Sequence, residues 1–187
     1  KPFKLFVVEA DGTEKPLSKT DIFQLQLKYT QIKKIFEKFK IKSEERNKIR
    51  VELNLPSNKT IVGYMVRMTY QKDPITFIKA IAKVAFKSSA IHFLIVGNGE
   101  LEEETKALAA AYGLEHYITF LDFRSDIPAL LNAIDIYCLP SLWEGMPIGL
   151  LEAMAMGKAC IATGVDGTLE LIQHEENGIL IPKKDEK

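Results

Sequence analysis

From residue 60 onward, the chain alternates short continuous apolar runs with longer segments whose apolar residues recur every three or four positions. The short runs are typical of strands buried on both faces, and the longer segments are typical of amphipathic helices. The predicted strands are Thr60–Met68, Ile91–Val96, Tyr117–Leu121, Ile134–Leu139, Ala159–Ala162 and Gly178–Ile181. The predicted helices are Pro74–Phe86, Glu100–Tyr112, Asp126–Ala133 (capped by Asp126), Leu150–Met156 and Thr168–Gln173. This alternation predicts an α/β fold with a doubly wound parallel sheet, in which ligands bind at the carboxyl ends of the strands.

Residues 1–58 follow a different pattern, and we expect them to form an N-terminal segment with linker helices, followed by a domain at 59–187. The segment predicts a strand at Phe3–Val8, a turn at Asp11-Gly12, a helix from Thr20 or Asp21 to about Lys40, and a short helix at Ser43–Leu53. Between residues 28 and 50 there are nine Lys or Arg and three Glu. Such a basic amphipathic stretch lies either on a membrane surface or, as we favour, against a neighbouring domain.

Composition narrows the classes of partner. The 187 residues fit one domain with an appendage, and a formal net charge of zero argues against nucleic acid, which favours a basic face. Cys138 and Cys160 both fall in predicted buried strands, so we expect core thiols rather than a disulfide or metal pair. The three histidines are scattered without ligand spacing, and no metal site is predicted. No apolar run reaches membrane-spanning length, and we expect a cytoplasmic protein, with peripheral contact at the inner face of the membrane as an open option.

The stretch from Ser141 to Gly157 predicts a strand-to-helix turn with a carboxylate at each end, Glu144 and Glu152, separated by seven residues. The turn contains two glycines and a proline, which suit close backbone approach and the first turn of a helix. Helix N-termini attract anions, whereas carboxylates bind hydroxyl groups, and a nucleotide sugar offers both a diphosphate and hydroxyls. A plainer alternative is equally open on this stretch alone: Glu152 interacts favourably with the helix dipole, and Glu144 is a solvated loop residue.

Further motifs lie at the ends of the other predicted strands. In chain order they are Val66-Arg67-Met68 with Gln71-Lys72-Asp73-Pro74, then Val96-Gly97-Asn98-Gly99, then the two glutamates, then Asn177-Gly178-Ile179-Leu180. In this order and spacing, the set resembles the C-terminal, donor-binding half of GT-B-fold retaining glycosyltransferases, the family of sucrose synthase and of many bacterial capsule and lipopolysaccharide enzymes. The resemblance covers about residues 60 to 182 and implies one Rossmann-like half of a GT-B fold. The sequence departs from the family pattern at Val66, Asp122 and Asp166, where glycine is common.

The resemblance implies a catalytic set of Glu144, Arg67 and Lys72. Arg67 and Lys72 match the basic pair on the donor diphosphate, where they would neutralise the leaving group without a metal. Glu144 matches the residue that faces the donor sugar, and Glu152 matches the one that holds the ribose hydroxyls. The remaining substrate-binding residues are implied to act through the backbone: Gly97 in its turn, Phe123 and Arg124 at the base, and Gly145, Met146, Ile148, Gly149 and Leu150 at the phosphates and sugar.

The implied reaction transfers a sugar, with retention, from a nucleoside diphosphate sugar to a hydroxyl of an acceptor glycan or lipid-linked saccharide. It needs no cofactor or metal, and a UDP-sugar is favoured by family frequency. The family's acceptor domain lies N-terminal to the donor half, and because the sequence begins at Lys1 without Met we expect a longer protein that supplies it. Two alternatives remain: an isolated nucleotide-sugar-binding module that is inactive without a partner domain, and a GT-B-like nucleotide-sugar epimerase.

Overall fold

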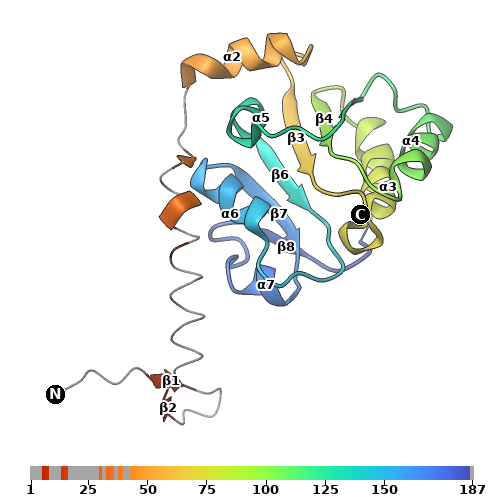
Figure 1. Ribbon diagram of the computed structural model, residues 1–187. Helices are drawn as coiled ribbons and strands as arrows, with labels where there is room; N and C mark the ends of the chain where they lie inside the picture. Colours follow the sequence, from red (N-terminus) through yellow and green to blue (C-terminus); the bar gives the residue numbers. More distant parts are fainter. Residues whose placement is uncertain are drawn as a thin grey trace. The chain divides into compact units, whose positions relative to one another are not determined.

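The computed structural model describes residues 6–8, 14–16, 30, 33–35, 38–39 and 43–185, which divide into two compact units, 1–38 and 39–187 (Figure 1). In the first unit, β1 (Phe6–Val8) pairs antiparallel with β2 (Glu14–Pro16). The strand predicted at Phe3–Val8 is therefore present over its last three residues. The predicted Asp11-Gly12 turn, and most of the helix predicted to end near Lys40, lie outside the described residues.

The second unit contains a six-stranded parallel sheet with the order β5-β4-β3-β6-β7-β8 (Figure 1). The strands are β3 (Thr60–Met65), β4 (Ile91–Val96), β5 (Ile118–Leu121), β6 (Ile136–Leu139), β7 (Ala159–Thr163) and β8 (Ile179–Ile181). Successive strands first add on one side of β3, and the chain then returns to add β6 on its other side. This switch in strand order lies between β3 and β6, where open parallel sheets bind ligands.

The connecting helices are α2 (Ser43–Glu52), α3 (Pro74–Ala85), α4 (Glu102–Ala111), α5 (Ile127–Ala133), α6 (Ile148–Ala155) and α7 (Asp166–Leu169), with a 3-10 turn η1 (Tyr70–Lys72) before α3. Helices α3 and α4 cover the sheet face that carries Val62, Tyr64 and Phe93, and together they form a buried apolar cluster. The other face carries Tyr137, which contacts α6 at Gly149. Helices thus lie on both faces, and the predicted doubly wound α/β fold is confirmed.

The details of the prediction that are wrong include one helix cap and the bounds of two helices. Asp126 stands before α5 but does not cap it, because its carboxylate binds the guanidinium of Arg124 instead. Helix α6 begins two residues earlier than predicted, directly after Pro147. The helix predicted at Thr168–Gln173 is the shorter α7, in which the Thr168 hydroxyl accepts a hydrogen bond from the Val165 N–H at 2.9 Å and so draws the start of the helix forward.

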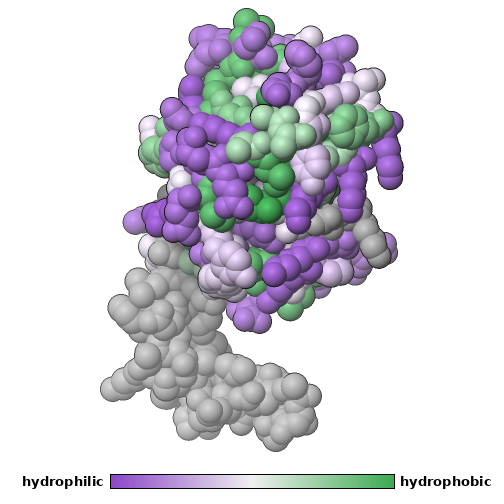
Figure 2. All heavy atoms as spheres, turned by 90° about the vertical axis from the view of Figure 1, so that its right-hand side faces the viewer, coloured by the Kyte–Doolittle hydropathy of each residue, from purple (hydrophilic) through white to green (hydrophobic). Residues whose placement is uncertain are grey.

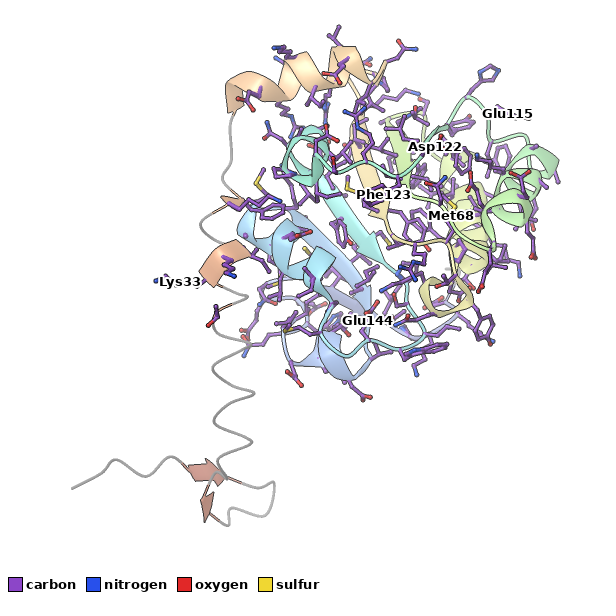
Figure 3. The ribbon with its side chains drawn as sticks, viewed as in Figure 1. Lys33, Met68, Glu115, Asp122, Phe123 and Glu144 are labelled. Atoms are coloured by element: carbon purple, nitrogen blue, oxygen red, sulfur yellow. The ribbon has the colours of Figure 1, made fainter. Side chains whose placement is uncertain are left out.

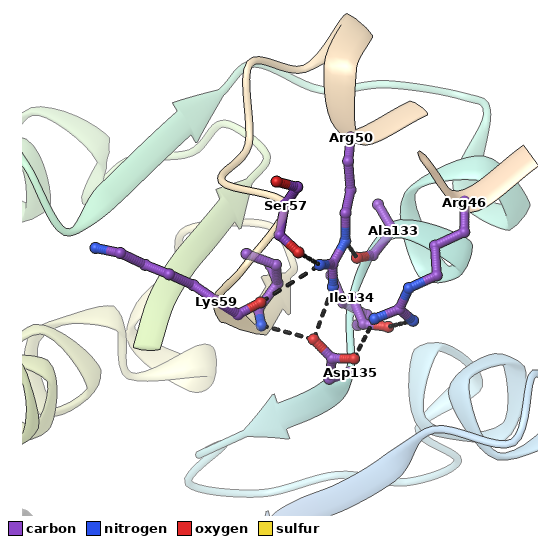
Figure 4. A network of polar contacts seen from close by, with 8 residues as sticks. Arg46, Arg50, Ser57, Lys59, Ala133, Ile134 and Asp135 are labelled. Atoms are coloured by element: carbon purple, nitrogen blue, oxygen red, sulfur yellow. Dashed lines mark hydrogen bonds and ion pairs between the residues drawn. The ribbon is translucent and has the colours of Figure 1, made fainter. Parts of the chain in front are cut away.

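At the amino ends of the strands, a polar network ties α2 to the sheet (Figure 4). Asp135 binds Arg46 through one carboxylate oxygen, and through the other it accepts from Arg50 at 2.7 Å and from the Ile61 N–H at 2.8 Å. Burial opposes ionisation of Asp135, but these donors outweigh it and hold the pKa of Asp135 below its usual value. Arg50 is only 4% exposed and donates further to the carbonyl oxygens of Ala133, Ser57 and Lys59. Two of the basic residues considered for a membrane surface therefore face the sheet instead.

Candidate functional site

The turns that carry Arg67, Lys72, Gly97 and Glu144 follow strands of the parallel sheet, so the fold brings them to its carboxyl edge. The Asn177-Gly178 stretch instead leads into β8. Two cavities open there on either side of the end of β3, and both are bordered by Met65 and Val66. A third cavity, of about 310 Å³, lies away from this edge between α3 and the strands and is lined almost wholly by apolar side chains. Figure 2 shows such side chains gathered at the centre of one face with polar residues around them. We therefore expect a ligand that carries phosphates and hydroxyls to bind at the carboxyl edge.

The first cavity, of about 430 Å³, lies between the loops that follow β3, β4 and β5. Its lining includes the predicted residues Arg67, Gly97, Phe123 and Arg124. Gly97 has a φ of 130°, and a Cβ there would lie 2.0 Å from the carbonyl oxygen of Val66, so only glycine fits this turn. The Phe123 N–H donates to the Asn98 side chain at 2.6 Å, which fixes the loop while the Phe123 ring stays 74% exposed. An exposed ring beside a cavity is suited to stacking on a planar base.

The two arginines of this cavity differ in whether their guanidinium groups are free to bind a ligand. Arg124 makes a two-pronged contact with Asp126, at 2.8 and 2.6 Å, and also lies 3.3 Å from Glu52. The hydrogen bonds that Arg124 donates to the Asp126 carboxylate raise the pKa of the Arg124 guanidinium further above its usual value. Arg67 is exposed, and no described residue forms a hydrogen bond or ion pair with its guanidinium. Arg67 is therefore the arginine whose donors are free to meet an anion.

The second cavity, of about 290 Å³, holds the charged pair predicted as catalytic. Lys72 and Glu144 form a direct ion pair, in which the Lys72 side chain is 21% exposed and that of Glu144 only 5%. Figure 3 shows Glu144 and Phe123 on separate loops of this edge. Glu144 is thus not the solvated loop residue of the plainer alternative. Its backbone oxygen also accepts from the Gly167 N–H at 3.0 Å, which pins this turn to α7.

The first turn of α6 forms one wall of this cavity through Met146, Pro147, Ile148 and Gly149. The N–H groups of Ile148 and Gly149 have no intrahelical partner, as at any helix start, so they remain available to an anion. The same prediction is wrong for Leu150, because its N–H donates to the Pro147 carbonyl at 3.0 Å and its side chain is wholly buried. Gly145 lies just before this turn and is exposed.

Glu152 lies on α6 one turn after Ile148 and Gly149, and therefore on the helix face that borders the second cavity. Glu152 is half-buried, and its carboxylate interacts electrostatically with the hydroxyl of Tyr137. Burial is the main cause that raises the pKa of Tyr137, and the charges of Glu152 and then Glu144 raise it further. Both glutamates thus lie near one buried tyrosine at the floor of the site.

Within the part of the chain that the structure describes, the residue types that bind metals do not gather in this way. Among the described residues, no three His, Cys, Asp or Glu side chains are placed to bind one ion. Cys138 and Cys160 are free and buried, as predicted, and burial raises the pKa of the Cys138 thiol to about 12. No helix in the described part of the chain is both long enough and apolar enough to cross a membrane.

Sequence reasoning missed several contributors to the two cavities. Asn98 was visible in the Gly97-Asn98-Gly99 motif, but its part in fixing the Phe123 loop was not predicted. Tyr137 was treated only as part of a buried strand, although a hydroxyl in a fully apolar run signals a need for a hydrogen-bond partner. Met65 and Val66, which border both cavities, carry no chemical signal in the sequence.

Two adjoining cavities therefore lie at the switch point of a parallel sheet. Around them are the free guanidinium of Arg67, the ion pair of Lys72 with Glu144, the unpaired amides at the start of α6, and Glu152. This combination suits a ligand that carries both phosphates and hydroxyls, bound at the carboxyl edge of the sheet. Residues 45–187 match the family described as glycosyl transferases group 1, and the chain belongs to that family.

Relatives and solved structures agree with this class. The chain is 37% identical over 137 residues to the Escherichia coli UDP-Gal:alpha-D-GlcNAc-diphosphoundecaprenol alpha-1,3-galactosyltransferase, covering 71% of this chain and 35% of that protein. It is similar to the crystal structure of Anabaena HepE in complex with UDP and glucose, with a TM-score of 0.75 and 27% identity over 81% of this chain and 42% of the other. It is also similar to the C-terminal domain of a glycosyl transferase group 1 protein from Francisella tularensis, with a TM-score of 0.71, 26% identity and coverage of 81% and 80%. The chain spans about a third of the length of the curated relatives it matches.

Proposed function

We propose that this chain is the donor-binding half of a retaining, metal-independent hexosyltransferase that uses a UDP-sugar as its donor. The observation that carries the proposal is the pair of adjoining cavities, one with an exposed aromatic ring and the other with the Lys72–Glu144 ion pair. In a nucleotide sugar a diphosphate joins a nucleoside to a sugar, so the base suits the first cavity and the sugar suits the second. The choice of UDP is supported by the UDP complex of HepE and by the UDP-Gal donor of the Escherichia coli relative.

The diphosphate would then lie across the end of β3, between Arg67 and Lys72 and against the first turn of α6. Hydrogen bonds between charged partners are worth about 1.5–3 kcal/mol each, so two cations suffice to neutralise much of a leaving diphosphate. That is the reason we propose a reaction without a divalent metal. Glu144 would meet the sugar hydroxyls and the positive charge that develops on the sugar ring, and Glu152 the ribose hydroxyls. Loss of the diphosphate from one face, with the acceptor hydroxyl entering on that same face, gives retention.

The whole reaction requires an acceptor half, which we propose binds a glycan or a lipid-linked saccharide, as the diphosphoundecaprenol-linked substrate of the relative suggests. Contact with the inner face of a membrane follows as part of this proposal. The chain by itself is then a nucleotide-sugar-binding domain whose turnover depends on the acceptor half.

The proposal is tested by calorimetric titration of the chain with UDP, GDP and ADP, each with and without a chelator of divalent ions. We expect UDP to bind most tightly and its affinity to be unchanged by the chelator. Loss of binding in the chelator contradicts metal independence. Equal binding of all three nucleotides, or none, contradicts the proposed donor.

A further inference from the structure

The loop between β3 and α3, residues 66–73, carries both Arg67 and Lys72 and is called the cation loop below. A buried tyrosine hydroxyl donates to a carbonyl oxygen near each of its ends. The Tyr64 hydroxyl donates to the carbonyl oxygen of Lys72 at 2.8 Å. The Tyr137 hydroxyl donates to the carbonyl oxygen of Met65 at 3.4 Å, a long hydrogen bond at the point where the loop begins. Both side chains are almost wholly buried, Tyr64 at 0% and Tyr137 at 1% exposed.

The two tyrosines reach the loop from opposite faces of the sheet. In the parallel register of β3 and β6, Tyr137 lies beside Gly63, so it shares the face of Gly63 and not that of its chain neighbour Tyr64. Tyr64 packs its ring on Phe77 of α3, with centroids 4.6 Å apart. Tyr137 faces α6. The cation loop is therefore held between the two helical layers of the domain.

Tyr137 makes a second contact that Tyr64 does not make. A Cβ built on Gly149 would lie 2.5 Å from the Tyr137 hydroxyl oxygen, so the hydroxyl occupies the space beside the first turn of α6. One oxygen atom thus contacts both the start of the cation loop and the turn that presents the free amides. Tyr137 also borders the second cavity, next to Lys72 and Glu144.

We propose that Tyr137 is a positioning residue for the diphosphate, whose hydroxyl sets the spacing between the cation loop and the first turn of α6. This inference rests on the proposed function, because it assigns a spacing role to a site that binds a diphosphate from both sides. A phenyl ring at the same position fills the same apolar volume but leaves the carbonyl of Met65 without its donor and the space beside Gly149 empty. The loop and the helix turn then lose their common contact.

The first test compares UDP with uridine by calorimetry in the wild-type chain and in Tyr137→Phe. The wild-type affinity ratio of UDP over uridine measures what the diphosphate contributes. We expect Tyr137→Phe to lower that ratio roughly three- to tenfold, the scale of one net hydrogen bond, and to leave uridine affinity within twofold. Tyr117→Phe is the matched control, since it deletes the same hydroxyl from a half-buried tyrosine beside Phe86, before β5, and should leave the ratio unchanged.

The second test is a double-mutant cycle that does not depend on the loss of one hydrogen bond. Gly149→Ala alone places a methyl group against the Tyr137 hydroxyl and should weaken UDP binding. In the Tyr137→Phe background the nearest remaining ring atom, Cζ, lies 3.5 Å from that methyl position, which is ordinary contact. The cost of Gly149→Ala should therefore shrink at least threefold in the double variant, a coupling expected only if the two residues share this space.

The outcomes separate the inference from the function on which it rests. A wild-type chain that binds UDP no better than uridine overturns the proposed function and the inference together. A wild-type preference for UDP that Tyr137→Phe retains in full overturns the inference alone, as does an equal loss for UDP and uridine. Independent, additive effects of Gly149→Ala and Tyr137→Phe also overturn it.

Discussion

The two ends of the sheet each carry an arginine- or lysine-carboxylate network, and the two networks differ in how completely their donors are used. At the amino edge, Arg50 donates to three backbone carbonyls as well as to Asp135, and Asp135 has three partners of its own. At the carboxyl edge, Glu144 is the one side-chain partner of the Lys72 ammonium among the described residues, and Arg67 has none there. A network whose donors are all engaged stabilises the fold, whereas unused donors beside a cavity can be completed by a ligand. The difference teaches that an ion pair is a sign of function only when it is incomplete.

The largest effect should come from Arg50→Ala, which removes a buried cation from the amino-edge network. Breaking a buried pair from one side typically costs about 3–5 kcal/mol. Here Asp135 would lose one of its three donors, and the carbonyls of Ala133, Ser57 and Lys59 would lose the donor that Arg50 supplies. We expect the free energy of unfolding to fall by about that amount in denaturant titrations. UDP affinity of the folded fraction should not change. Arg46→Ala is the control: its side chain is 31% exposed, so a loss of about 1 kcal/mol is expected. Equal losses for both variants would contradict the contrast in burial.

Glu144→Ala should have the next largest effect, on turnover in the full-length enzyme. A carboxylate opposite charge that develops on the sugar acts chiefly in the transition state, so kcat should fall about a hundredfold or more with UDP affinity nearly intact. Glu152→Ala is the paired variant and should instead weaken every uridine nucleotide, with or without a sugar. A Glu144→Ala enzyme that lost UDP binding but kept its turnover at saturation would show that the two roles are exchanged.

Lys72→Ala and Arg67→Ala measure the unused donors directly. Each should lower UDP affinity about ten- to a hundredfold and leave uridine affinity unchanged, since each removes a charge-assisted contact worth about 1.5–3 kcal/mol. Lys72→Ala should also reduce stability, because it leaves the buried Glu144 without its cation, whereas Arg67→Ala should not. Lys106→Ala, which breaks an exposed pair with Glu102 on α4, serves as the control. If both nucleotide and nucleoside were lost equally, these two residues would support the fold and not the phosphates.

The smallest of the four effects is an acid sensitivity near the amino edge, at His92, which pairs in register with Ile61. Burial and then Lys59 lower the pKa of His92 from 6.5 to about 4, so the folded chain holds this ring neutral where the unfolded chain protonates it. The contribution of the neutral His92 ring to the free energy of unfolding is fully present above pH 6.5. It declines as the pH falls toward 4, by about 2 kcal/mol between pH 7 and pH 5. Unfolding titrations of His92→Gln should lack this component. His116→Gln, at an exposed histidine, should keep it.

Much of the fold could be predicted from the sequence, because local sequence patterns indicate the strands and helices of this domain. Continuous apolar runs, such as Phe93–Val96 within β4, indicate strands buried on both faces. The ordered turns with Arg67, Lys72, Gly97 and Glu144 likewise depend only on residue type and spacing. Since parallel strands bring their carboxyl ends to one edge, these turns could be placed at one site before any contact was known.

What the tertiary structure alone decided is which atoms are already in use. The sequence places Asp126 as a helix cap and the Leu150 N–H at a ligand, but the first binds Arg124 and the second binds Pro147. It assigns Arg67 to the diphosphate and Arg124 to the base, but it does not indicate that Asp126 and Glu52 occupy the guanidinium of Arg124. Glu144 is buried against Lys72, which lies 72 residues earlier, and Tyr137 meets Met65 across the same distance. Local pattern determines the elements because propensity and periodicity act within a few residues; the partner of a buried donor depends on which distant loops the strand order brings together.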